Sequence, residues 1–168
     1  FKGVINIPKV ALIRVDYRLI HDQVVAKWLK DKQSTKIIIV NDVLAKDRTM
    51  GNIYRMATPA GVRCAIVSTG HFVDSWKTTQ LGDGVAMVLF KDIETVYNAW
   101  KQGFDLKDLQ IGGLGAGPGR KAVYQNMTLD EKDYKLLNEL SRDVNIFFQA
   151  TPEDNKKLYN SVAENISF

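Results

Sequence analysis

The chain has 168 residues, of which 45% are hydrophobic and 25% charged, the size and composition of one globular domain. A single cysteine, Cys64, excludes an internal disulfide framework, and no apolar run approaches the length of a membrane span. Residues 1–56 carry 11 Lys and Arg against 5 Asp and Glu, which favours an anion-facing surface there. A dense basic stripe with interleaved aromatic residues is missing, so we expect no nucleic-acid binding. The first ten residues lack the features of a signal peptide, and we expect a cytoplasmic domain.

Short apolar runs alternate with longer segments of helical periodicity along the chain. Strands are expected at 9–15, 35–41, 61–68, 84–90, 106–113 and 144–150, and residues 121–129 alternate like one exposed or edge strand. Helices are expected at 22–32, 44–59, 70–80, 92–103, 128–142 and 151–166, the fifth capped by Thr128 and the last with Pro152 at its first position. This rhythm predicts a single α/β domain over 1–168. Its sheet is expected to be open, twisted and mostly parallel, with helices on both faces.

In such sheets ligands bind beyond the carboxyl ends of the strands, so function is expected there. The glycine-rich stretch 112–119 follows one of these ends, but Pro118 and Arg120 stand where a G-x-G-x-x-G motif would need glycines. We therefore expect a flexible loop and no cofactor site at this stretch. His71 has no Cys or His at ligand spacing, so no metal site is expected either.

His21 lies between the first predicted strand and the first turn of the first predicted helix. A helix start presents N–H groups and a partial positive charge, which suit a phosphate group. Arg18, three residues earlier, carries a planar guanidinium that binds phosphate oxygens in pairs. A neutral histidine ring nitrogen in that setting is a suitable nucleophile for carrying a phosphoryl group. A lone histidine in a loop is also often structural, so these residues alone leave both interpretations open.

The string RVDYRLIHDQV, residues 14–24, resembles the active-site segment of a IIB component of the bacterial sugar phosphotransferase system, in its mannose/fructose/sorbose family. That family has an Arg-x-Asp-x-Arg-Leu-Ile-His-x-Gln-Val pattern around a phosphorylated histidine, whose place is taken here by His21. The stretches 37–47, 56–68, 87–103 and 109–123 follow in the family's order at similar spacings. The resemblance therefore covers most of the chain.

The resemblance implies an active loop at the carboxyl edge of the sheet and a phosphocarrier role. His21 is implied to accept a phosphoryl group from the phosphohistidine of a IIA component. It would pass the group to a hydroxyl of the sugar held by membrane IIC and IID components, which makes the chain a protein-histidine–sugar phosphotransferase. The resemblance further implies a cytoplasmic domain that associates peripherally with the membrane transporter, and a homodimer is an additional expectation.

Five residues are candidates for contact with the phosphoryl group. Arg18 is the first, with Arg14 in support, and Gln23 is expected to hydrogen-bond the phosphate or to brace the loop. Ser68 and Thr69, at the end of the third predicted strand, either donate to phosphate oxygens or simply cap a helix.

Acidic residues also lie near the histidine in the sequence, and a carboxylate that faces phosphate repels it. Asp16 is therefore expected to fix Arg18 or the loop. Asp22 stands where the family has glycine directly after the histidine, and Tyr17 replaces a residue that is usually acidic. Asp22 is expected to cap the first helix; otherwise it would slow phosphorylation. The alternative function is a IIB-like domain with weakened transfer that acts in partner binding or regulation.

Overall fold

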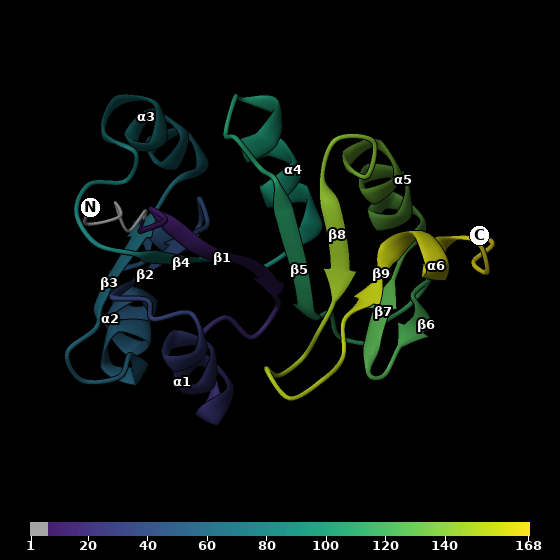
Figure 1. Ribbon diagram of the computed structural model, residues 1–168, viewed down its shortest axis with the longest axis horizontal. Coiled ribbons are helices and arrows are strands. Elements are labelled where there is room, and N and C mark those ends of the chain that lie inside the picture. The colour runs from purple at the N-terminus through teal and green to yellow at the C-terminus, as the bar shows by residue number, and fades with distance from the viewer. Residues whose placement is uncertain (1–6) are drawn as a thin grey trace, which may run out of the picture.

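The computed structural model describes residues 7–168, and for Asp22 within this range it describes the backbone only. Strands and helices alternate through most of this range, as Figure 1 shows. The strands are β1 Val10–Asp16, β2 Lys36–Val40, β3 Arg63–Val67, β4 Ala86–Phe90, β5 Asp108–Gly113, β6 Lys121–Tyr124, β7 Met127–Leu129, β8 Asn145–Phe148 and β9 Lys157–Leu158. The helices are α1 Asp22–Asp31, α2 Arg48–Ala57, α3 Thr69–Thr79, α4 Ile93–Lys101, α5 Glu131–Leu140 and α6 Tyr159–Ala163.

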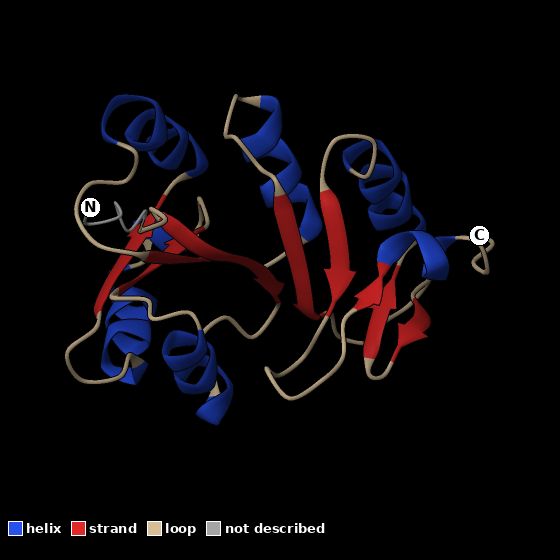
Figure 2. Ribbon diagram, viewed as in Figure 1, coloured by secondary structure: helices blue, strands red, loops and turns tan. Residues whose placement is uncertain are grey.

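The main sheet has the strand order β3-β2-β4-β1-β5-β8-β9, and every pair is parallel except β8 with β9. Helices α1 and α2 pack on one face, and α3, α4 and α5 pack on the other (Figure 2). Because both faces are covered, all five residues of β2 and all five of β4 are buried, which explains the apolar runs 37–40 and 86–90. The predicted α/β fold with a mostly parallel sheet is confirmed.

Several helices begin at side chains that accept a hydrogen bond from the first turn. Asp47, Ser68, Asp92 and Asp130 cap α2, α3, α4 and α5 in this way. The predicted cap Thr128 is therefore wrong, since Thr128 lies in β7 and the cap of α5 is Asp130, two residues after it. Among residues 7–168, no helix combines the length and apolar character that crossing a bilayer requires.

Three predicted elements differ from the structure. The expected helix 44–59 is divided into a short 3-10 helix, η1 Leu44–Lys46, and α2, because Asp47 between them is extended. The expected single strand 121–129 is a hairpin, because Gln125, with φ 46°, turns β6 back to pair with β7. The expected helix 151–166 is replaced by a turn, the short strand β9 and the five-residue helix α6. The Asp154 carboxylate accepts from both the N–H and the hydroxyl of Thr151, and this local closure competes with a helix that would begin at Pro152.

The order of the strands places the carboxyl end of β1 at a switch in direction. From β1 the chain proceeds through α1 and β2 to the edge strand β3. After β4 it crosses to the other side of β1 and continues through α4 to β5. Helices α1 and α4 lie on opposite faces of the sheet, so their connections diverge on either side of β1. Open α/β sheets bind ligands at such a point, which is where the loop with His21 begins.

Candidate functional site

Two apolar side chains hold the loop between β1 and α1 in place. Leu19 is 1% exposed and Ile20 is 8% exposed, and both pack in the core cluster beneath α1. Leu19 has φ 57°, a left-handed conformation that costs a non-glycine residue about 1 kcal/mol, and burial of its side chain offsets that cost. Its N–H donates to the carbonyl of Asp16 at 2.9 Å. His21 follows as the extended N-cap residue of α1, at the predicted strand-to-helix turn.

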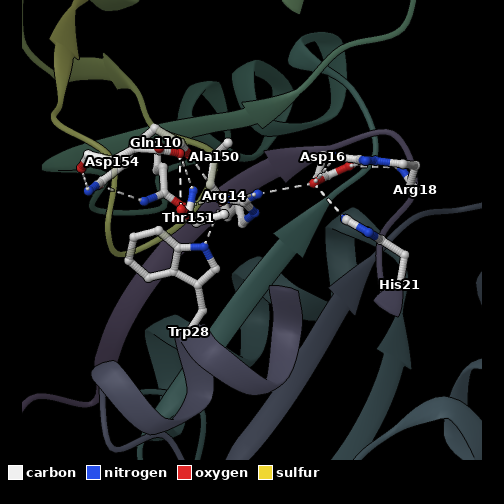
Figure 3. Close-up of polar contacts among 10 residues, drawn as sticks. Arg14, Asp16, Arg18, His21, Trp28, Gln110, Ala150, Thr151 and Asp154 are labelled. Atoms are coloured by element: carbon white, nitrogen blue, oxygen red, sulfur yellow. Dashed lines mark hydrogen bonds and ion pairs between the residues drawn. The ribbon is translucent and has the colours of Figure 1, made fainter. Parts of the chain in front are cut away.

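The carboxylate of Asp16 connects the charged residues of this loop (Figure 3). It is fully buried, and Oδ1 accepts from the backbone N–H and the Nε of Arg18, each at 3.1 Å. Oδ2 accepts from Nη2 of Arg14 at 3.2 Å and lies 3.0 Å from Nε2 of His21. The side chain of His21 is 12% exposed, whereas that of Arg18 is 42% exposed. Asp16 thus holds Arg18, as expected from the sequence, and it also contacts the histidine, which was not expected.

The ionisation of Asp16 determines which nitrogen of His21 carries the proton. Burial raises the pKa of Asp16, but the hydrogen bond from Arg18 and the charge of Arg14 outweigh it, so the net pKa lies below its ordinary value. An ionised carboxylate only accepts hydrogen bonds. When the ring of His21 is neutral, Nε2 therefore carries the proton and the lone pair is on Nδ1.

Arg14 is not on the surface, contrary to its assignment as a phosphate contact. Its side chain is 2% exposed, and Nη1 donates to Oε1 of Gln110 at 2.5 Å and to the carbonyl of Gln149 at 3.0 Å. Nη2 donates to the carbonyl of Ala150 at 3.0 Å, and the guanidinium lies 5.6 Å from the ring centroid of Trp28. Burial lowers the pKa of Arg14, and the charge of Asp16 opposes that shift. This geometry gives Arg14 a bracing role beneath Asp16.

Other predicted contacts lie away from His21. The carboxyl end of β3, with Ser68 and Thr69, is separated from that of β1 by β2 and β4, which amounts to about 14 Å at the usual strand spacing. Ser68 caps α3, and the N–H of Thr69 donates to Asp42 at 2.7 Å. The helix-cap interpretation therefore holds for Ser68, whereas Thr69 is the first residue of α3, and the phosphate-contact alternative lacks geometric support for both. Gln23 is exposed in the first turn of α1, next but one to His21.

Asp22 was expected to be the N-cap residue of α1, and the backbone shows that it is not. The N-cap residue of α1 is His21, and Asp22 is the first residue inside the helix. The side chain of Asp22 lies outside the described part of the structure.

Sequence reasoning missed the brace around Arg14. Trp28 donates from Nε1 to the carbonyl of Ala150 at 3.0 Å, and Gln110 donates to the side chain of Gln149 at 3.2 Å (Figure 3). These partners come from α1, β5 and the segment after β8, so no local pattern predicts their meeting. Gly112 and Gly113 end β5, as the expected strand 106–113 has it, and both are buried, so the expected loop begins only after them. Two glycines within an apolar strand do signal a close approach of other groups, and this signal was available.

The described residues also form cavities that His21 does not line. One of about 680 Å³ lies at the carboxyl end of β3 and is lined by residues such as Asp42, Ser68 and His71. Another cavity, of about 480 Å³, lies at the amino ends of β1 and β5, lined by residues such as Lys9, Phe104 and Asp108. That is the opposite edge of the sheet from His21. Within residues 7–168, no group of three or more His, Cys, Asp and Glu side chains is arranged to hold a metal ion.

A family model described as the PTS system sorbose subfamily IIB component matches residues 10–166. The chain belongs to the sorbose family of IIB components of the phosphotransferase system. This IIB component is 32% identical over 134 residues to the sorbose-specific EIIB component of Klebsiella pneumoniae, covering 80% of this chain and 82% of that one. The crystal structure of the IIBSor domain of the K. pneumoniae sorbose permease matches with a TM-score of 0.88 at 28% identity, covering 96% of this chain and 99% of that one. That of manxB from Thermoanaerobacter tengcongensis matches with a TM-score of 0.87 at 33% identity, covering 94% and 96%.

The predicted family is thus confirmed. IIB components are phosphotransferase subunits that work with a IIA component and membrane IIC and IID components in sugar uptake.

Proposed function

We propose that this IIB component is a phosphocarrier that accepts a phosphoryl group on His21 from a IIA component. It then passes the group to a hydroxyl of a sugar held by the membrane components. The observation that carries the proposal is the contact of 3.0 Å between Nε2 of His21 and the buried carboxylate of Asp16, at the carboxyl end of β1. This contact orients the ring, with Nδ1 as the nitrogen that attacks phosphorus in the proposed reaction.

In the first step, Nδ1 of His21 forms a bond to phosphorus as the bond between phosphorus and the donor histidine breaks. The His21 ring then carries a positive charge, because its Nε2 proton is retained. The carboxylate of Asp16 stabilises that charge without itself becoming protonated. In the second step, the sugar oxygen attacks phosphorus, the N–P bond breaks, and the hydroxyl proton passes to a base on the acceptor side. Both steps need mainly positioning and neutralisation of charge.

Arg18 is our candidate for neutralising the phosphoryl oxygens. Its Nε is fixed by Asp16, yet 42% of its side chain is exposed beside the loop. The first turn of α1 directly follows His21 and adds backbone N–H groups that have no partner within the helix. We assign Arg14 to bracing Asp16 and give it no contact with the phosphoryl group.

The test uses a radiolabelled phosphorylated IIA component of the same family as donor. We expect acid-labile phosphate on the parent chain and none on His21→Ala. His71→Ala is the matched control, since His71 is the chain's other histidine and lies in α3. Label retained in His21→Ala, or lost only in His71→Ala, would refute the assignment. A parent chain that binds the phosphorylated donor but accepts no label would favour the regulatory alternative.

A further inference from the structure

The end of β5 beside the transfer site has an irregular register. Val15 pairs with Ile111, but the next residue, Asp16, pairs with Gly113, so Gly112 is an extra residue in β5. The N–H of Tyr17 then donates to the carbonyl of Gly113 at 3.1 Å. Bulges of this kind re-aim the groups around them and are frequent beside active sites. Here the bulge brings Gly113 against the carboxylate that holds His21.

The two glycines provide space that side chains of the loop occupy. A Cβ atom on Gly112 would lie 1.9 Å from Cζ of Arg14. A Cβ atom on Gly113 would lie 2.8 Å from Oδ1 of Asp16 and 2.9 Å from Nη2 of Arg18. Neither glycine has a positive φ, so the requirement is for space and not for backbone conformation.

The neighbours differ in how far they can yield. Arg14 and Asp16 are both buried and held by several hydrogen bonds, so neither moves without breaking those bonds. Arg18 is partly exposed, and beyond Asp16 its guanidinium contacts the ring of Tyr17, 5.4 Å from the centroid. A side chain on Gly113 would therefore displace Arg18 outward and press on the carboxylate that orients His21.

We propose that Gly113 is a positioning residue for phosphoryl transfer. Its missing side chain lets Asp16 hold Arg18 and His21 together at the end of β1. This inference rests on the proposed function of His21, and it adds a requirement that the histidine segment itself does not contain. Gly112 serves the buried Arg14 in the same way, and we expect substitution there to act mainly on folding.

The experiment compares Gly113→Ala with Gly117→Ala in transfer from the phosphorylated IIA component. Gly117 lies in the same stretch, and a Cβ atom there would meet only the side chain of Arg120, at an ordinary 3.5 Å. We expect Gly113→Ala to slow transfer by about tenfold or more, the effect of losing a charge-assisted contact. Gly117→Ala should transfer at the parent rate.

Two further readouts separate positioning from a general loss of structure. The ¹⁵N chemical shifts of His21 report its tautomer without any donor, and we expect the Nε2-protonated form of the parent to be less populated in Gly113→Ala. Arg18→Ala should also reduce the effect of Gly113→Ala, because one of the two crowded groups is then absent. A purely structural role would change neither the tautomer nor this coupling.

A graded substitution covers the case in which Gly113→Ala does not fold. A Cβ atom on Gly115 would lie 3.2 Å from the Tyr17 ring, which is exposed and against which Arg18 packs. Gly115→Ala should therefore fold like the parent and transfer a few-fold more slowly, by a small displacement of Arg18.

The proposal is overturned if a folded Gly113→Ala transfers at the parent rate with an unchanged tautomer. If Gly113→Ala does not fold, an unchanged rate in Gly115→Ala overturns it. A parent chain that accepts no phosphate would instead refute the proposed function, and the tautomer measurement on the unphosphorylated protein would still decide the role of Gly113.

Discussion

Two arginines contact the same carboxylate from opposite sides, and their surroundings differ completely. Arg14 is 2% exposed and donates to protein groups from β5 and from the segment that follows β8. Arg18 is 42% exposed, and beyond Asp16 the partner of its guanidinium is the ring of Tyr17. The comparison teaches that contact with a buried acid does not define the role of an arginine. The remaining donors of Arg14 are used within the protein, whereas Arg18 has surface left for a ligand.

The largest expected effect is on folding stability and comes from substitution of the buried Arg14. Arg14→Ala should lower the free energy of unfolding by about 3–5 kcal/mol, because it leaves Asp16 short of a cation and several buried acceptors without a donor. Urea unfolding followed by circular dichroism measures this directly. Arg18→Ala is the matched substitution on the exposed side. Equal losses in the two variants would abolish the distinction between the two arginines.

Substitution of the partly exposed Arg18 should affect phosphoryl transfer more than folding. We expect Arg18→Ala to slow phosphorylation of His21 by about tenfold to a hundredfold, since a charge-assisted contact is worth roughly 1.5–3 kcal/mol. Its cost in unfolding free energy should be smaller than that of Arg14→Ala, because Arg18 is partly exposed and Asp16 keeps its hydrogen bond from Arg14. Rapid-quench measurement with labelled IIA gives the rate. A variant whose stability falls as much as its rate would show that Arg18 is structural.

A smaller effect is expected from Asp22, which directly follows His21 in the chain. Because Asp22 is not the helix cap, we expect its charge to oppose the incoming phosphoryl group by about 1 kcal/mol. Asp22→Gly should then raise the transfer rate by about fivefold, and the gain should fade at high salt. Asp22→Asn removes the charge while keeping the size and should show the same gain. No gain in either variant would mean that the carboxylate is remote from the reacting atoms.

The smallest expected effect is a loss of folding stability at acidic pH. The folded-state pKa of Asp16 lies below its ordinary value, so its contribution to stability is complete above that ordinary value, about pH 4. The contribution is lost as the pH falls through the lower, folded-state pKa. Below pH 4 the parent should therefore lose more unfolding free energy than Asp16→Asn does. If both proteins lost the same unfolding free energy, Asp16 would not be the source of the loss in acid.

The sequence predicted the elements that depend on local periodicity. The buried runs of β2 and β4 and the turn with His21 lie where they were expected, because apolar spacing and the strand-to-helix change are visible locally. The brace of Arg14 was not predictable in this way, since Gln110 and Gln149 lie 96 and 135 residues further along the chain. The helix expected at 151–166 failed because Asp154 closes a turn and β9 pairs with β8.

The anchoring of Leu19 has a consequence for turnover. The side chain of Leu19 is buried in the core, and its N–H donates a hydrogen bond to the carbonyl of Asp16. These two contacts fix the backbone between Arg18 and His21. We therefore expect the backbone of His21 to keep one position during loading and unloading. Under the proposed role, donor and acceptor must each bring their reacting atoms to the same point in space. Their binding is then mutually exclusive, and the exchange of one partner for the other sets an upper limit on the number of sugars delivered per second.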